Sequence, residues 1–125
     1  MAGVGLRNRR ILVVEDEFVI ATDLQHRLEA IGVVVIGPIG SVERAVATIE
    51  SEANLDAAIV DMNLGGQMAY PVADALVRRR LPFVFASGYG EDVLRDRYPN
   101  AINCNKPYEF RALMLALDDV LSRNS

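Results

Sequence analysis

The sequence predicts an α/β domain with a doubly wound, five-stranded parallel sheet, and three observations support that prediction. Three short apolar runs, residues 11–14, 57–60 and 83–86, each end at a polar side chain. Segments with helical periodicity separate the runs, and no composition break interrupts the alternation. Continuous apolar runs of this length are typical of strands buried on both faces. Right-handed crossovers between such strands predict a sheet of order 2-1-3-4-5 with helices on both faces.

The first half of the chain supplies two strand–helix units. We expect strand one at 10–14 and a helix whose apolar stripe stops at Gly32, a residue suited to a helix end. A short second strand spans 33–36 and ends at Gly37–Pro38. Ser41 then N-caps helix two, because its hydroxyl can accept a hydrogen bond from a first-turn amide. The two apolar stripes comprise Phe18, Ala21, Leu24, Leu28 and Ile31, and then Val42, Ala45, Val46 and Ile49.

The second half supplies three more units. Strand three ends on Asp61, and Gly65–Gly66 marks a flexible loop before helix three. Strand four follows Leu81–Pro82, helix four (91–98) is short and polar, and strand five (101–105) carries two asparagines. The apolar stripes comprise Ala69, Val72, Ala73, Leu76 and Val77 in helix three, Val93, Leu94 and Tyr98 in helix four, and Phe110, Leu113, Met114, Leu117, Val120 and Leu121 in helix five.

Length and composition indicate one globular domain. The chain has 125 residues, of which 51% are hydrophobic and 24% charged, and we expect a flexible leader at 1–8, the domain at 9–122 and a tail at 123–125. No apolar stretch is long enough to span a membrane. The net charge of -4 gives no reason to expect direct DNA binding. Cys104 is the only cysteine, which excludes an internal disulfide and fits a cytoplasmic protein.

The ends of the predicted strands bring chemically useful side chains to one edge of the sheet. Glu15, Asp16 and Asp61 fall side by side at the switch point between strands one and three. Neighbouring carboxylates repel by roughly 4 kcal/mol per pair at an effective dielectric near 20, so such a group needs a proton, a cation or a metal. Oxygen ligands favour Mg²⁺, with Lys106 as a further cation and Ser87 as a hydrogen-bond donor. This set supports phosphoryl transfer to Asp61 as nucleophile.

In this order, Glu15–Asp16, Asp61, Ser87 and Lys106–Pro107 resemble the receiver domain of bacterial two-component response regulators, from Arg9 to Leu121. The resemblance implies a flavodoxin-like three-layer sandwich. It implies that Asp61 accepts a phosphoryl group from a histidine kinase or phosphotransfer protein, and that the switched surface contacts a downstream protein partner. It also implies a protein that is not an enzyme beyond its own phosphoryl transfer and slow dephosphorylation.

The resemblance assigns a Mg²⁺ cofactor and its ligands. Asp16 and Asp61 would bind the ion directly, Glu15 through water, and Asn63 through its backbone carbonyl. Glu15 stands where aspartate is more usual in the family, so its side chain reaches further.

On the phosphate side, the resemblance implies that Ser87 donates to the phosphoryl oxygens and that Lys106 pairs with them, with a cis bond before Pro107 fixing the lysine. Residues 82–90 resemble the Phe-Ala-Thr-Gly-Tyr ("FAT GUY") receivers of alphaproteobacteria, with serine in place of threonine. Asn103 replaces the aromatic switch residue of ordinary receivers. We therefore expect a different switch, around Gly88 and Tyr89 and in the helix that follows.

Two other functions stay open. A Mg²⁺-dependent phosphohydrolase with an aspartyl-phosphate intermediate would need an acid two residues beyond Asp61, where the chain has Asn63. A receiver-like scaffold could bind a partner without phosphorylation. Ser87 could also be a turn former and Lys106–Pro107 an exposed turn, and the sequence leaves the cognate kinase, the output partner and the oligomeric state open.

Overall fold

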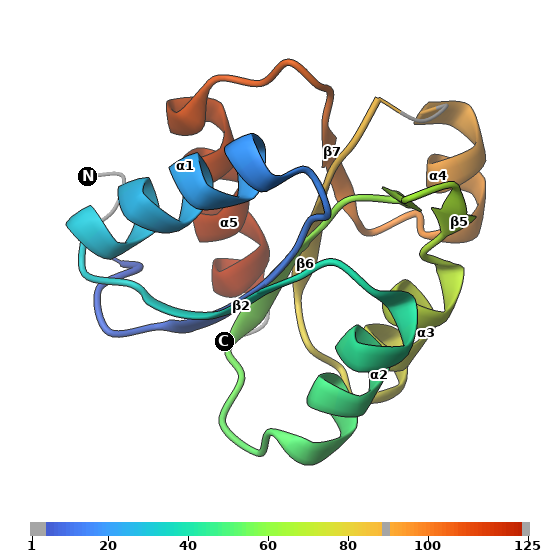
Figure 1. Ribbon diagram of the computed structural model, residues 1–125, viewed down its shortest axis with the longest axis horizontal. Coiled ribbons are helices and arrows are strands. Elements are labelled where there is room, and N and C mark those ends of the chain that lie inside the picture. The colour runs from blue at the N-terminus through green and yellow to red at the C-terminus, as the bar shows by residue number, and fades with distance from the viewer. Residues whose placement is uncertain (1–4, 89–90, 124–125) are drawn as a thin grey trace.

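A computed structural model of the chain describes residues 5–88 and 91–123, and its centre is a five-stranded parallel sheet between two layers of helices (Figure 1). The strand order is β2-β1-β3-β6-β7, which is the predicted order 2-1-3-4-5 once the two short strands β4 and β5 are set aside. The flavodoxin-like prediction is therefore confirmed. The sheet strands are β1 (Arg10–Val14), β2 (Val34–Ile39), β3 (Ala57–Val60), β6 (Phe83–Ala86) and β7 (Ile102–Cys104).

Five helices form the two outer layers. One layer holds α1 (Phe18–Ala30) and α5 (Phe110–Arg123), and the other holds α2 (Val42–Ser51), α3 (Tyr70–Arg78) and α4 (Glu91–Arg97) (Figure 1). Successive side chains of a strand point to opposite faces, so each central strand contributes to two cores. In β1, Leu12 and Val14 join the core under α2 and α3, whereas Ile11 and Val13 join the core under α1 and α5.

Two predicted signals at helix ends have the expected geometry. The Ser41 hydroxyl accepts a hydrogen bond from the backbone N–H of Arg44 at 3.2 Å, which caps α2. Gly32 has φ +93° just after α1, a conformation in which glycine is favoured over other residues. Among the described residues, no helix combines the length and apolar composition that crossing a bilayer requires.

One loop prediction was wrong, and another gains a defined structure. β2 does not end at Gly37–Pro38 but continues to Ile39, with a shift of register against β1 between Leu12 and Val14. An edge strand tolerates this irregularity because a proline there removes no ladder hydrogen bond from a second neighbour. Gly65–Gly66 is the turn of an antiparallel hairpin of β4 (Asn63–Leu64) and β5 (Gln67–Met68), and both glycines have positive φ.

Some burial predictions also need correction. Phe18 and Val77 were expected inside, but Phe18 is 80% exposed at the first residue of α1 and Val77 is 53% exposed in the last turn of α3. Both residues lie at helix ends, where the sheet no longer covers the apolar side chains of the helix. Leu6 falls within the predicted leader, yet its side chain is fully buried in the α1/α5 core. The side chain of Val93 lies outside the described residues.

Candidate functional site

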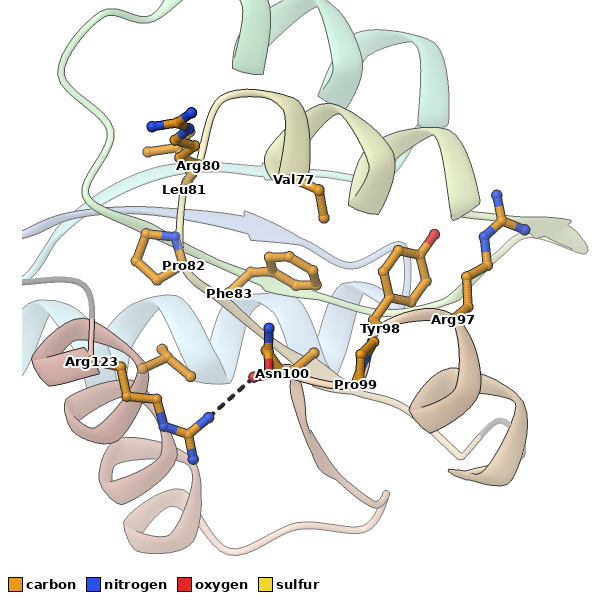
Figure 2. A pocket seen from close by; sticks show the side chains of 12 residues that line it. Val77, Arg80, Leu81, Pro82, Phe83, Arg97, Tyr98, Pro99, Asn100 and Arg123 are labelled. Atoms are coloured by element: carbon orange, nitrogen blue, oxygen red, sulfur yellow. Dashed lines mark hydrogen bonds between the residues drawn. The ribbon is translucent and has the colours of Figure 1, made fainter.

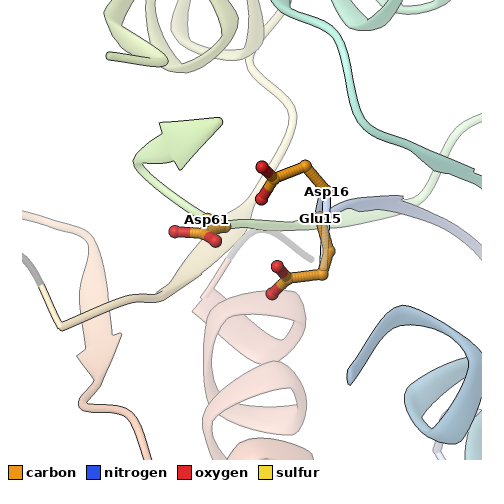
Figure 3. Close-up of side chains that lie close together, drawn as sticks. All are labelled: Glu15, Asp16 and Asp61. Carbon is orange, nitrogen blue, oxygen red and sulfur yellow. The ribbon is translucent and has the colours of Figure 1, made fainter. Parts of the chain in front are cut away.

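Three carboxyl groups meet where two neighbouring strands end. Glu15 and Asp16 follow β1, Asp61 follows β3, and the two strands pair in parallel up to Val14 and Val60. The backbone N–H of Asp61 donates to the carbonyl of Val14 at 2.9 Å, which fixes the ends side by side. One carboxylate oxygen of each of the three acids lies within 4.8 Å of the others (Figure 3). The structure thus brings together the acids that the sequence predicted at this edge.

Lys106 joins this cluster from a distant part of the chain. Its Nζ lies 2.8 Å from Oε1 of Glu15 and 2.9 Å from Oδ2 of Asp61. The same ammonium lies 3.5 Å from Oε1 of Glu17. The side chain of Lys106 is only 18% exposed, so these contacts are partly shielded from water. One compact cation therefore bridges two buried acids.

Electrostatics at the site show that the acids are not fully compensated. Burial raises the pKa of Glu15 from 4.5 to about 7, despite hydrogen bonds from Lys106 and from the Glu17 amide, and the negative charge of Asp61 adds to the increase. Burial by itself would lower the pKa of Lys106, but its hydrogen bonds to Glu15 and Asp61 raise that pKa above its ordinary value. The lysine is held charged while one carboxyl group still resists ionisation. A second cation would reduce the electrostatic repulsion between these carboxylates.

The donor set fits a magnesium ion. Glu15 and Asp61 are each 5% exposed, whereas Asp16 is exposed and can reach a partly hydrated ion. Hard oxygen ligands with room for water are what Mg²⁺ prefers. The amide of Asn63 donates to Oδ1 of Asp61 at 3.1 Å, which orients that carboxylate. The Asn63 side chain accepts from the amide of Gly66 at 2.9 Å, so the hairpin turn holds it; the role predicted for its backbone carbonyl stays a prediction.

The residues predicted to contact phosphate lie at the same edge of the sheet. Ser87 follows β6 and is 1% exposed, and its backbone N–H donates to the carbonyl of Cys104 at 3.2 Å. The amide of Lys106 donates to the carbonyl of Ser87 at 3.4 Å, which ties the ends of β6 and β7 together. The Lys106–Pro107 peptide bond is cis. Gly88 is exposed beside Ser87, and Tyr89 lies outside the described residues.

Sequence reasoning missed two contributors. Glu17 lies beside Lys106, and its amide donates to Oε2 of Glu15 at 3.1 Å. The unbroken run of three acidic residues after β1 could have indicated that Glu17 also belongs to the site. Gly40 lies so close to Asp16 that an added Cβ would be 3.2 Å from the Asp16 Cα atom. The lack of a side chain at Gly40 lets the β2–α2 loop pack directly against the acid.

The chain is similar to several solved structures. No protein-family model and no curated protein matches the sequence. SdrG from Sphingomonas melonis Fr1 is 35% identical, with 99% of this chain and 98% of that chain covered and a TM-score of 0.69. A response regulator receiver protein from Sinorhizobium medicae WSM419 has a TM-score of 0.85 at 22% identity, covering 96% of this chain and 99% of that one. The HemR receiver domain from Leptospira biflexa has a TM-score of 0.78 at 25% identity, covering 92% and 95%.

Fold and site together define the class of this protein. A five-stranded sheet of order 2-1-3-4-5 that gathers acids and a lysine at its carboxyl edge is the architecture of a receiver domain. Because the similarity to SdrG extends over nearly all of both chains, the chain belongs to the response regulator receiver family of two-component systems.

Proposed function

We propose that this receiver domain is a phosphorylation switch in which Asp61 accepts a phosphoryl group from a histidine kinase or phosphotransfer protein. One observation supports this above others. A single ammonium, Lys106 Nζ, lies within 2.9 Å of the carboxylates of both Glu15 and Asp61, with exposed Asp16 alongside. This arrangement supplies a nucleophile, a cation for the incoming oxygens and ligands for a metal.

The proposed transfer moves one phosphoryl group between two side chains. A carboxylate oxygen of Asp61 attacks phosphorus, the phosphorus–nitrogen bond of the donor phosphohistidine breaks, and the freed imidazole takes up a proton. Ser87 donates to a phosphoryl oxygen, and Lys106 moves from the Asp61 carboxylate to the new oxygens. Asp16 and Asp61 would hold Mg²⁺ directly, Glu15 would hold it through water and Asn63 through its backbone carbonyl, and the ion would neutralise charge during the transfer.

The proposed consequence of phosphorylation is a change in the surface that the domain presents to a partner. The phosphoryl group adds nearly two negative charges beside Ser87, so the segment after β6 is the first to respond. We place the chain in the FAT GUY subfamily because Phe85-Ala86-Ser87-Gly88-Tyr89 follows its motif except for serine in place of threonine, and because Asn103 stands at the usual aromatic position. We infer that the switch lies around Gly88, Tyr89 and α4, and that a downstream protein reads it.

The remaining assignments follow from the same proposal. The receiver domain would span 9–122 and act in the cytoplasm without binding DNA directly. Its only chemistry would be its own phosphorylation and slow dephosphorylation. Asn63 supports this over a phosphohydrolase, because an amide cannot act as the general acid that such an enzyme needs at that position.

Phosphotransfer from an autophosphorylated histidine kinase tests the proposal. Label should move to the wild-type chain in the presence of Mg²⁺, and chelation of the metal should stop the transfer. Asp61→Ala should accept no label, whereas Asp118→Asn on α5, remote from the site, should accept it normally. Transfer to Asp61→Ala at the wild-type rate would show that the acceptor is another residue.

A further inference from the structure

Four side chains attach the end of α4 to α3. The Tyr98 hydroxyl donates to Oδ1 of Asp74 at 2.7 Å, and the guanidinium of Arg97 donates to Oδ2 of the same carboxylate at 2.9 Å. The guanidinium carbon of Arg97 also lies 4.2 Å from the centroid of the Tyr70 ring. Tyr70 and Asp74 are one turn apart on α3, whereas Arg97 and Tyr98 are consecutive at the end of α4. We call these four residues the Asp74 cluster.

The position of α4 depends strongly on this cluster. The helix has only seven residues, and Leu94 is the one buried side chain among those of the helix that the structure describes. Tyr98 is 5% exposed, so its hydrogen bond to a carboxylate is shielded from water and is stronger than that of an exposed pair. Figure 2 shows Arg97 and Tyr98 next to each other, with the Tyr98 hydroxyl directed towards α3.

The Tyr98 ring also contacts β6, the strand that leads to the proposed phosphorylation site. Its centroid lies 5.5 Å from that of Phe85 and 6.2 Å from that of Phe83. Alternate residues of a strand share a face, so Phe83, Phe85 and Ser87 face the same layer of helices. Ser87 is two residues from Phe85. A shift of Ser87 towards a phosphoryl group would therefore reach Phe85 and, through it, Tyr98.

Unfilled space adjoins both of these rings. A hollow of about 50 Å³ adjoins Phe85, and Leu94 and Asn103 also line it. A larger cavity of about 430 Å³ adjoins Tyr98 (Figure 2). Close packing normally holds core side chains in a single arrangement. Here both rings have room for a second one.

We propose that the Asp74 cluster holds α4 in its resting position and that phosphorylation of Asp61 releases the helix. The inference rests on the function proposed above and names the contact that regulates it. Ser87 turns to the phosphoryl oxygens, Phe85 and Tyr98 follow, and the hydrogen bond from Tyr98 to Asp74 breaks. The released α4 then presents a different surface to the downstream partner.

Release of α4 and binding at Asp61 are thermodynamically linked. Because the Asp74 cluster is intact only in the resting state, a variant without it populates the released state more. Such a variant binds a phosphoryl mimic at Asp61 more tightly, since binding and release favour each other by the same factor. Loss of a hydrogen bond to a charged group shifts an equilibrium of this kind by about tenfold. A contact that only stabilises the fold leaves this affinity unchanged.

Titration with beryllofluoride and Mg²⁺, a mimic of a phosphoryl group on aspartate, tests the proposal on the full chain through amide chemical shifts. Tyr98→Phe and Asp74→Asn should each bind about threefold to tenfold more tightly than the wild type. The double variant should gain less than the product of the two single gains, because both changes remove the same bond. Ile49→Val, in the core under α2, costs a comparable amount of stability and should leave the affinity within about twofold.

Amide hydrogen exchange over 91–98 separates release of the helix from a simple loss of stability. Without beryllofluoride, these amides should exchange faster in Tyr98→Phe than in the wild type. With saturating beryllofluoride, the two proteins should exchange alike, because the cluster is then released in both. A difference that persists in the bound state would overturn the proposal, as would unchanged or weaker binding by both variants.

The wild type separates a failure of the phosphorylation site from a failure of the Asp74 cluster. If beryllofluoride does not saturate the wild type, both proposals are refuted. If it saturates at Asp61 with equal affinity in the wild type and in both variants, the phosphorylation site stands and the release of α4 from Asp74 is refuted. If Tyr98→Phe does not fold, Asp74→Asn decides the question by the same two measurements.

Discussion

Replacing Glu15 by glutamine should stabilise the metal-free protein at neutral and alkaline pH. The pKa of Glu15 is raised from 4.5 to about 7 in the fold, chiefly by burial, so the folded state holds this proton more tightly than the unfolded state does. The stability linked to that proton is present below pH 4.5 and is lost as the pH rises towards 7. Glutamine has no titratable proton, so the free energy of unfolding of the variant does not fall in this way as the pH rises.

The structure gives the size of the effect. At about 1.4 kcal/mol for each pKa unit, a change from 4.5 to about 7 corresponds to about 3 kcal/mol, which is the largest gain expected at pH 8. The substitution leaves no isolated ammonium, because Lys106 keeps its 2.9 Å contact with Asp61. At pH 4.5 the gain should vanish.

Urea unfolding of the wild type and of Glu15→Gln at pH 4.5 and pH 8, without and with Mg²⁺, measures this directly. The gain at pH 8 should shrink when Mg²⁺ is added, because the bound ion compensates the same charge. Glu17→Gln is the matched control: its side chain is 62% exposed, so its effect should stay below about 0.5 kcal/mol. An equal gain at both pH values, or an equal gain in the control, would refute the reasoning.

Three further predictions concern the attachment of α4 to α3 and the proposed metal site. Tyr98→Phe removes a 2.7 Å hydrogen bond from the phenol to Asp74 and should lower the free energy of unfolding by about 1–2 kcal/mol in urea titrations; an unchanged value would mean that this bond does not anchor α4 to α3. Gly40→Ala places a Cβ 3.2 Å from the Asp16 Cα atom and should weaken Mg²⁺ binding, as calorimetry would measure; unaltered affinity would show that the loop yields freely. Mg²⁺ at ten times its dissociation constant should raise the free energy of unfolding of the wild type by about 1.4 kcal/mol, and Asp16→Asn should reduce that increase; equal increases would remove Asp16 from the ligand set.

The sheet was predictable because its central strands are buried on both faces. The runs 11–14 and 57–60 are apolar without interruption, and such runs have few alternatives to a covered parallel sheet. Their ends, Glu15 and Asp61, were then fixed by topology alone, since parallel neighbours finish at the same edge. The acids of the site followed from the fold.

Features that depend on close packing were not predictable. β2 passes through Gly37–Pro38 because an edge strand has one neighbour only, and the sequence does not say which strand is at the edge until the topology is known. The exposure of Phe18 depends on how far α1 extends past the sheet. The approach of Lys106 to Glu17 involves side-chain directions in two loops, which periodicity does not report.

Chemical phosphorylation followed by intact-mass analysis and peptide mapping tests the central claim most directly. The wild type and Asp61→Asn are each incubated with a small acyl phosphate, with and without Mg²⁺. The account predicts one added phosphoryl group on the wild type, located at Asp61 and dependent on Mg²⁺, and none on the variant. A phosphoryl group on Asp61→Asn, or equal phosphorylation of the wild type without Mg²⁺, would contradict it.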